Sequence, residues 1–291
     1  MTVAQALQQA WSLGLARIDA QVLLLHVMGQ ASHARAWLLT HDRHTLSDAQ
    51  QAAFEQALLR RLRGEPVAYL TGEKEFFGLR LHVDARVLDP RADTETLVEW
   101  ALDVLSNHVL PHRQTPKVLD LGTGSGAIAL AIQHTRPDAT VYAVDASVAA
   151  LEVARSNAQA LNLPVQWIHS HWLQNVQGAF DVIVSNPPYI AEQDPHLSSL
   201  THEPLQALAS GPDGLDDLRD IIHTALPHLE PGGWLLLEHG HDQAQSVQKL
   251  LTQAGFVAVQ SRTDLAGILR CSGGQKLSLI HISEPTRPER I

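Results

Sequence analysis

The sequence has very little cysteine and few aromatic residues. Cys271 is the single cysteine among 291 residues, so the chain cannot form a disulfide bond within itself. Such cysteine usage is typical of proteins in a reducing compartment. Aromatic residues make up 5% of the chain, but hydrophobic residues of all kinds reach 45%, which is enough for a sizeable core. These values exclude a small domain held together by disulfides.

Long apolar runs and an excess of positive charge are also missing. No run approaches transmembrane length, and residues 1–5 lack the charged start of a signal peptide. We therefore expect a cytoplasmic protein without a membrane partner. The chain has 21 Lys and Arg against 31 Asp and Glu, a net charge of −10 with neutral histidine. Because duplex-binding proteins usually present a basic face, we expect no direct nucleic-acid binding.

Histidine is abundant, with 17 residues, but its pattern does not indicate a metal site. The closest groupings lie at 41–44, 169–171 and 239–241. No His-Glu-x-x-His motif or cysteine pair accompanies them, and alternate residues of a strand point to opposite faces. We expect no metal.

The most informative motif is Asn186-Pro187-Pro188-Tyr189, which follows the apolar run 180–185. Open α/β sheets bind ligands at the carboxyl ends of their strands. The Asn186 side-chain oxygen and the Pro187 carbonyl are two acceptors that suit a planar amino group, and Tyr189 can cover its flat face. The motif predicts catalytic roles for these three residues, with Pro188 stiffening the substrate site. The alternative is an ordinary turn that ends a strand.

A glycine-rich loop upstream predicts a nucleotide-type cofactor. An apolar strand at 117–121 runs into the loop, and a helical stretch follows. Glycines allow a ligand to approach the backbone closely, and the helix N-terminus offers free N–H groups. A second strand, 140–145, ends in an acid about 20 residues past the loop, where it can bind ribose hydroxyls. The predicted cofactor residues of this half are Asp120, Gly122, Thr123, Gly124, Ser125, Gly126 and Asp145.

The spacing Gly122-x-Gly124-x-x-Ala127 also fits a dinucleotide fingerprint. Two features favour S-adenosylmethionine over a nicotinamide. Asp120 precedes the first glycine, where a carboxylate can serve the ammonium group of an amino acid, and the motif at 186–189 follows at a later strand. Neither feature is useful for hydride transfer.

The pattern along the chain predicts a helical region, a connector and an α/β region. Residues 1–72 read as helices with capping boxes at Thr2 and Ser47, and they form either a docking domain or packing support. Residues 73–92 predict a hairpin connector. Residues 93–275 begin with Asp93 as the N-cap of a helix reaching Asn107.

Alternating strands and helices after residue 117 predict a mostly parallel sheet covered on both faces. The later strands are expected at 165–169, 180–185, 233–239 and 256–262, and the loop 191–213 is a candidate lid. Residues 276–291 fit neither pattern, so we interpret them as a non-native or disordered tail.

The chain strongly resembles the HemK/PrmC family of protein-(glutamine-N5) methyltransferases. The motifs that carry the resemblance are Gly64–Gly72, Asp93–Val98, Leu119–Gly126, Val184–Ala191 and Leu237–Gly240. The chain departs from the family at Ala92, at His171 and in a shortened loop before Glu203.

The resemblance implies a class I, Rossmann-like S-adenosylmethionine methyltransferase with a small N-terminal helical domain. It places the cofactor on Gly122 to Gly126, Asp145, Trp172 and Asn186, and the substrate glutamine on residues 186–189. It also implies a function, N5-methylation of the glutamine in the Gly-Gly-Gln motif of class 1 peptide chain release factors. The alternatives are methylation of a ribosomal protein glutamine or of nucleic acid, or an inactive cofactor-binding scaffold. The chain's own Gly273-Gly274-Gln275 is interpreted as coincidence.

Overall fold

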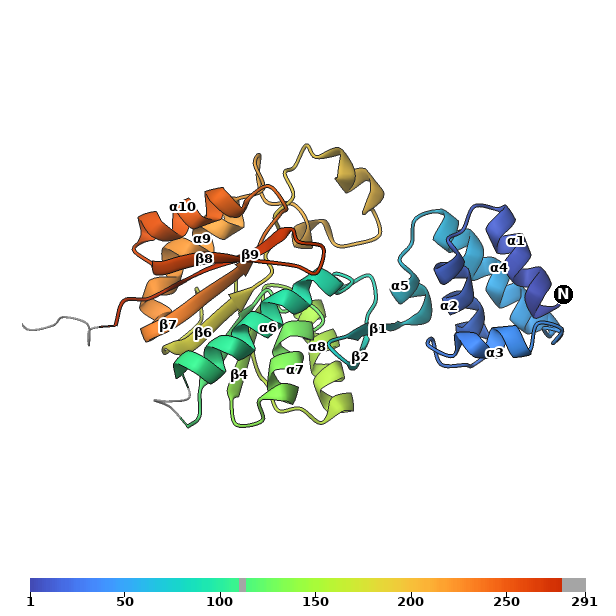
Figure 1. Cartoon of the computed structure of the whole chain (residues 1–291), viewed down its shortest axis with the longest axis horizontal. Helices are drawn as coiled ribbons and strands as arrows, with labels where there is room; N and C mark the ends of the chain where they lie inside the picture. Colours follow the sequence, from blue (N-terminus) through green and yellow to red (C-terminus); the bar gives the residue numbers. More distant parts are fainter. Residues whose placement is uncertain (110–113, 279–291) are drawn as a thin grey trace, which may run out of the picture.

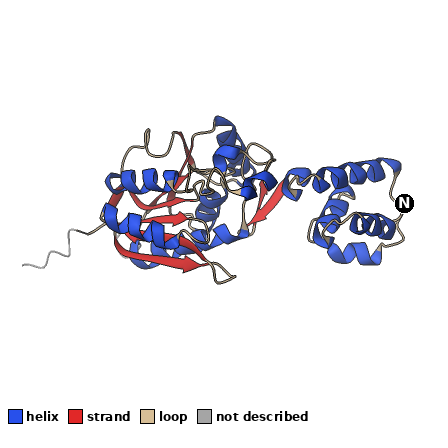
Figure 2. Cartoon of the chain, turned by 90° about the horizontal axis from the view of Figure 1, so that it is seen from above, coloured by secondary structure: helices blue, strands red, loops and turns tan. Residues whose placement is uncertain are grey.

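The computed structural model describes residues 1–109 and 114–278. A group of helices lies at one end of the molecule and an α/β region at the other, joined by a two-stranded hairpin (Figures 1 and 2).

The helical region contains α1 (Val3–Ser12), α2 (Arg17–Val27), α3 (Arg35–Thr40), α4 (Asp48–Leu62) and α5 (Val67–Thr71). Both predicted capping boxes are confirmed, because Thr2 and Ser47 each exchange two hydrogen bonds with the residue three positions later. The apolar faces of the helices meet in a separate core that includes Leu23, Leu24, Phe54 and Leu58.

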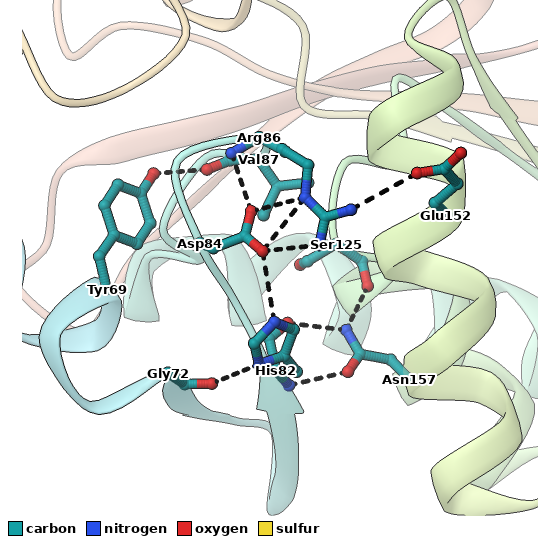
Figure 3. Close-up of polar contacts among 9 residues, drawn as sticks. All are labelled: Tyr69, Gly72, His82, Asp84, Arg86, Val87, Ser125, Glu152 and Asn157. Carbon is teal, nitrogen blue, oxygen red and sulfur yellow. Dashed lines mark hydrogen bonds and ion pairs between the residues drawn. The ribbon is translucent and has the colours of Figure 1, made fainter.

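The connector forms the predicted hairpin, with β1 (Glu73–Phe76) antiparallel to β2 (Leu79–His82). Figure 3 shows how β2 is fastened to α8 (Val148–Leu161) by Asn157. The Asn157 Oδ1 atom accepts from His82 N at 2.7 Å, and Nδ2 donates to His82 O at 3.0 Å and to Ser125 O at 2.9 Å. One buried amide therefore joins the connector, α8 and the glycine loop.

The central sheet has seven strands in the order β5-β4-β3-β6-β7-β9-β8. The first five in this order are parallel, and β9 runs antiparallel to both of its neighbours. The apolar strand β6 is buried along its whole length, as expected for a strand covered on both faces. The strands are β3 (Lys117–Leu121), β4 (Thr140–Asp145), β5 (Gln166–His169), β6 (Phe180–Ser185), β7 (Leu229–Glu238), β8 (Val257–Thr263) and β9 (Leu269–Gln275).

Two hydrophobic clusters cover the two faces of this sheet. One joins it to α6 (Glu95–Val104), α7 (Ala127–Thr135) and the inner side of α8. The other joins it to α9 (Asp216–Ala225) and α10 (Ala244–Ala254). Short helical turns occupy the connections, at Ala92–Thr94 (η1), Leu105–Val109 (η2), Pro195–Ser199 (η3), Leu205–Ala207 (η4) and Leu226–His228 (η5).

Asp93 is not the N-cap of the first helix of this region, contrary to the prediction. A 3₁₀ turn begins after Arg91 and places Asp93 inside η1, so that Thr94 directly precedes α6. Asp93 pairs instead with Arg270, at 3.1 Å between Oδ2 and Nη2. The regular helix also ends at Val104 and continues as a π-helical turn to Val109.

Strand β9 was not predicted, because its Gly273 and Gly274 interrupt the apolar pattern. A Cβ atom on Gly273 would lie 2.7 Å from the Leu235 carbonyl oxygen, and one on Gly274 would lie 2.8 Å from the Phe256 Cβ. The two glycines therefore allow close packing within the sheet, which gives this Gly-Gly-Gln segment a structural role.

The predicted tail begins at Lys276, and its residues 279–291 lie outside the described part of the chain. Lys276 itself belongs to the sheet region, since its backbone N donates to Gly233 O at 2.8 Å and its Nζ donates to Leu229 O at 2.6 Å. In the described ranges, no helix is both long and apolar enough to cross a membrane.

Candidate active site

A cavity of about 300 Å³ lies at the carboxyl ends of β3, β4 and β6. This is the edge at which open α/β sheets bind ligands. Several predicted site residues meet around it although they are far apart in sequence. Its lining includes Arg86, Val87, Leu88, Gly122, Gly124, Asp145, Ala146, Ser147, Ala150, Ser170, His171, Trp172, Asn186, Pro188, Pro204, Gln206, Ala207 and Asp217.

The glycine loop has a conformation that requires glycine. Gly122, Gly124 and Gly126 have φ values of +71°, +55° and +85°, which L side chains rarely adopt. A Cβ atom on Gly122 would lie 3.1 Å from the Trp172 ring. The loop therefore keeps its backbone in close contact with Trp172 and open to a ligand.

Asp145 closes the cavity from the end of β4. Its Oδ2 atom accepts from Gly124 N and its Oδ1 atom accepts from Ser147 N, both at 2.8 Å. Burial raises the pKa of this carboxyl group above its usual value, and the backbone hydrogen bonds oppose the rise. An acid held in this way fits the predicted role of binding ribose hydroxyls.

Asp120, Thr123, Ser125 and Gly126 do not line the cavity. The fully buried Asp120 accepts from Thr123 Oγ1 at 2.6 Å and from Ala129 N at 3.2 Å, so it supports the loop from beneath. Burial raises the pKa of Asp120 to about 7. A direct contact between Asp120 and a cofactor ammonium group stays a prediction, and the other three residues shape the loop.

Trp172 lies in the cavity wall with a positive φ of +42°. Its indole Nε1 donates to Asp217 Oδ1 at 3.0 Å. Asp217 belongs to the first turn of α9 and supplies a carboxylate to the cavity wall beside Trp172. The neighbouring Ser170 and His171 line the same cavity but have no carboxylate. Sequence reasoning missed Asp217 because α9 is distant along the chain.

A second, smaller cavity of about 110 Å³ lies beside the first. Asn186 lines both cavities, Pro188 lines the first, and Pro187 and Tyr189 line the second. The Asn186 Nδ2 atom donates to Thr94 Oγ1 at 3.2 Å. Because this bond occupies the amino end of the Asn186 side chain, the carbonyl end is available as an acceptor.

The predicted lid loop, residues 191–213, lines both cavities. Ala207 lines both cavities, and Pro204 and Gln206 line the larger one. The loop is held by Glu203, whose Oε1 accepts from Arg91 Nη2 at 2.5 Å. The shortened segment before Glu203 therefore leaves this contact intact.

The connector supplies Arg86, Val87 and Leu88, which sequence reasoning did not place at the site. Arg86 is held by Asp84, and the hydroxyl group of Tyr69 donates to the Val87 carbonyl (Figure 3). The sequence pattern of these residues does not indicate that they line a cavity, because their position depends on how the hairpin packs against the α/β region.

The fold, the glycine loop and the acid at the end of β4 agree with a class I methyltransferase, and a family model identifies the chain as one. The family model described as Methyltransferase small domain matches residues 98–213, and the one described as PrmC N-terminal domain matches residues 2–72. A methyltransferase structure from Pyrococcus furiosus has a TM-score of 0.52 at 20% identity, covering 77% of this chain and 99% of that chain. This likeness concerns the fold alone.

Two relatives named release factor glutamine methyltransferase cover nearly the whole chain. The one from Bordetella pertussis is 49% identical over 90% of this chain and 95% of its own length. The one from Burkholderia pseudomallei is 47% identical, with 89% and 91% covered. The chain belongs to the release factor glutamine methyltransferase family.

Proposed function

We propose that the protein transfers a methyl group from S-adenosylmethionine to the side-chain nitrogen of the glutamine in the Gly-Gly-Gln motif of class 1 release factors. The names of the relatives support this substrate. The observation that carries the proposal is the position of Asn186, which lines both the cavity of the glycine loop and the smaller cavity of residues 187 and 189.

The larger cavity fits the cofactor by its chemistry. Asp145 offers a carboxylate for hydroxyl groups, Gly122 and Gly124 expose backbone, and Val87 and Ala146 offer apolar contact. Bound there, S-adenosylmethionine supplies an electrophilic methyl group.

The smaller cavity suits the glutamine carboxamide. The lone pair of an amide nitrogen is delocalised, so the enzyme must orient the NH₂ group and stabilise the positive charge that develops there. Asn186 Oδ1 and the Pro187 carbonyl oxygen are the two acceptors for this task. Tyr189 lines the same cavity and limits the orientations that the plane of the carboxamide can take.

The helical region 1–72 is proposed to dock the release factor, with residues 73–92 as connector and 93–275 as catalytic region. A substrate of this kind works in translation termination, so we propose a cytoplasmic location for the protein. We propose no nucleic-acid partner, in keeping with the net charge of −10.

Mass spectrometry tests the function directly. The intact protein and S-adenosylmethionine are incubated separately with a release factor, ribosomes and RNA, and the products are mapped. We expect a gain of one methyl group on the Gly-Gly-Gln glutamine. Methylation confined to the ribosome or RNA pool would contradict the proposal, and cofactor binding without turnover on any pool would favour an inactive scaffold.

Replacing Asn186 by Ala tests the site. The turnover number at saturating cofactor should fall by about 10²–10³, the scale for loss of one preorganised hydrogen bond to developing charge. Unchanged turnover would remove Asn186 from the reaction.

A further inference from the structure

Gln243 directly precedes α10, and its half-buried side chain has no part in the steps above. Its Nε2 atom donates to the carbonyl oxygen of Tyr189 at 3.0 Å, and more weakly to those of Gly214 at 3.3 Å and Asp213 at 3.4 Å. Its Oε1 atom accepts from Gly240 N at 2.8 Å. One side-chain amide therefore joins the end of the substrate motif, the end of the lid loop and the segment after β7.

These partners allow only one orientation of the Gln243 amide. A backbone carbonyl oxygen can only accept a hydrogen bond, and a backbone N–H can only donate one. The NH₂ group must therefore face Tyr189 and Gly214, and the oxygen must face Gly240. The opposite orientation would place an oxygen against carbonyl oxygens and an NH₂ group against an N–H group. Gln243 is thus a crosslink of defined geometry.

Two glycines leave the space that this amide fills. A Cβ atom on Gly214 would lie 2.3 Å from the Tyr189 carbonyl oxygen and 2.9 Å from Gln243 Nε2. A Cβ atom on Gly240 would lie 3.0 Å from Gln243 Oε1. Any side chain on Gly214 would therefore displace the hydrogen bond between Gln243 and Tyr189. The chain on both sides of the amide is packed closely around this contact.

The peptide group between Tyr189 and Ile190 is held at both of its ends. Gln243 binds its carbonyl oxygen, and its N–H, which belongs to Ile190, donates to Leu208 O in the lid loop at 2.9 Å. A peptide group is planar, so two bonds on opposite sides prevent it from rotating. Because this group is attached to the Tyr189 Cα atom, its orientation determines where the Tyr189 ring can lie. That ring lines the smaller cavity.

We propose that Gln243 is a positioning residue for the methylation reaction, which holds the Tyr189 peptide group and so fixes the Tyr189 ring against the substrate carboxamide. This inference rests on the proposed function. Without the amide, the carbonyl of Tyr189 loses this partner and the peptide group can rotate, which moves the ring. Misplacement of a positioned group by about 1 Å can cost about 10²-fold in rate.

The test compares Gln243→Met, Gln243→Glu and the control Gln245→Met with the wild type. Methionine is close to glutamine in size but makes neither hydrogen bond, whereas glutamate keeps the acceptor for Gly240 N and lacks the NH₂ group. Gln245 is an exposed residue of the same helix, so the control repeats the exchange away from the motif.

The turnover number and KM for an intact release factor are measured beside the calorimetric Kd for S-adenosylmethionine. We expect both Gln243 variants to lower the turnover number by about 10–100-fold, with little change in cofactor Kd. Gln245→Met should keep the wild-type turnover number. A purely structural role would lower stability without lowering the turnover number of the folded enzyme, so urea unfolding is measured as well.

A double-mutant cycle tests whether Gln243 acts through Tyr189. If it does, Gln243→Met should cause little further loss of turnover in the Tyr189→Ala background. A full multiplicative loss there would overturn the inference.

Gln243→Glu keeps the side-chain size and the contact with Gly240, so it carries the same cycle if Gln243→Met does not fold. An unchanged turnover number in Gln243→Glu would also overturn the inference. If the wild type does not methylate the release factor, the proposed function itself fails, which is a separate result.

Discussion

The backbone N–H of Gly124 donates a hydrogen bond of 2.8 Å to Asp145 Oδ2 and so joins the loop after β3 to the end of β4. The second oxygen of Asp145 accepts from Ser147 N. Both contacts involve backbone atoms, so the carboxylate is held in place without a ligand. Cofactor binding therefore requires little ordering of this acid, and this favours affinity.

Replacing Asp145 by Ala should weaken S-adenosylmethionine binding by about 10–100-fold, equivalent to about 1.4–2.8 kcal/mol. The change removes both the proposed ribose contact and the support of Gly124. Isothermal calorimetry measures the effect. Asp138→Ala is a suitable control, because Asp138 precedes β4 and pairs with Arg136 at 2.7 Å. Equal affinities in the two variants would exclude Asp145 from the cofactor site.

Gly126→Ala should destabilise the protein more than Gly14→Ala. Both glycines have positive φ, +85° and +90°, so both variants carry the left-handed backbone penalty of about 1–2 kcal/mol. A Cβ atom on Gly126 would also lie 3.1 Å from Leu130 and 3.2 Å from Ala154. A Cβ atom on Gly14 would have no such neighbour within 4 Å. Overpacking adds about 1–3 kcal/mol. Urea unfolding should show this order, and equal losses would mean that the contacts of Gly126 relax without cost.

Asp120→Asn should change how stability depends on pH. The pKa of Asp120 is about 7 in the folded protein, against 3.8 for an ordinary aspartate. Between these values the unfolded chain releases the proton and the folded protein keeps it, so the wild-type free energy of unfolding falls as pH rises.

The Asp120→Asn variant cannot titrate at this position. Its stability relative to the wild type should therefore rise between pH 4.5 and pH 7.5, by at most about 1.4 kcal/mol per pH unit. Urea unfolding of the cofactor-free proteins measures the difference. A stability difference that stays constant across this range would show that Asp120 does not hold its proton near neutrality.

Asn157→Ala should lower the free energy of unfolding by about 2–4 kcal/mol, because it leaves backbone groups of His82 and Ser125 without their partner. It should also weaken cofactor binding, since Ser125 belongs to the glycine loop. Gln159→Ala, at an exposed position of the same helix, is the control. A loss no larger than in this control would argue against the coupling of connector and loop seen in Figure 3.

Much of the fold could be predicted because local patterns agree with the final structure. The run 180–185 is mostly apolar and forms β6, and the Thr2 and Ser47 capping boxes begin α1 and α4. Strand β9 could not be predicted, because Gly273 fits there only through its close approach to Leu235, which is a tertiary contact.

The same distinction applies to the candidate site. The positions of Asn186 and Asp145 at the cavity could be predicted, because Asp145 ends an apolar strand and Asn186 directly follows another at the sheet edge where ligands bind. Thr94, Asp217 and Glu238 belong to three distant elements, and their relation to the site follows from packing. No spacing in the sequence indicates that these side chains contact Asn186, Trp172 and Tyr189.

Adjacent residues attach the predicted lid loop to the helical region and to the connector. His202 Nε2 lies 3.1 Å from the Arg63 carbonyl oxygen of the helical region, and Glu203 holds Arg91 at the end of the connector. If the helical region moves away from the sheet, either the His202–Arg63 contact breaks or the loop moves with the helices. Access to both cavities and the angle between the two halves are mechanically linked through this short stretch of chain.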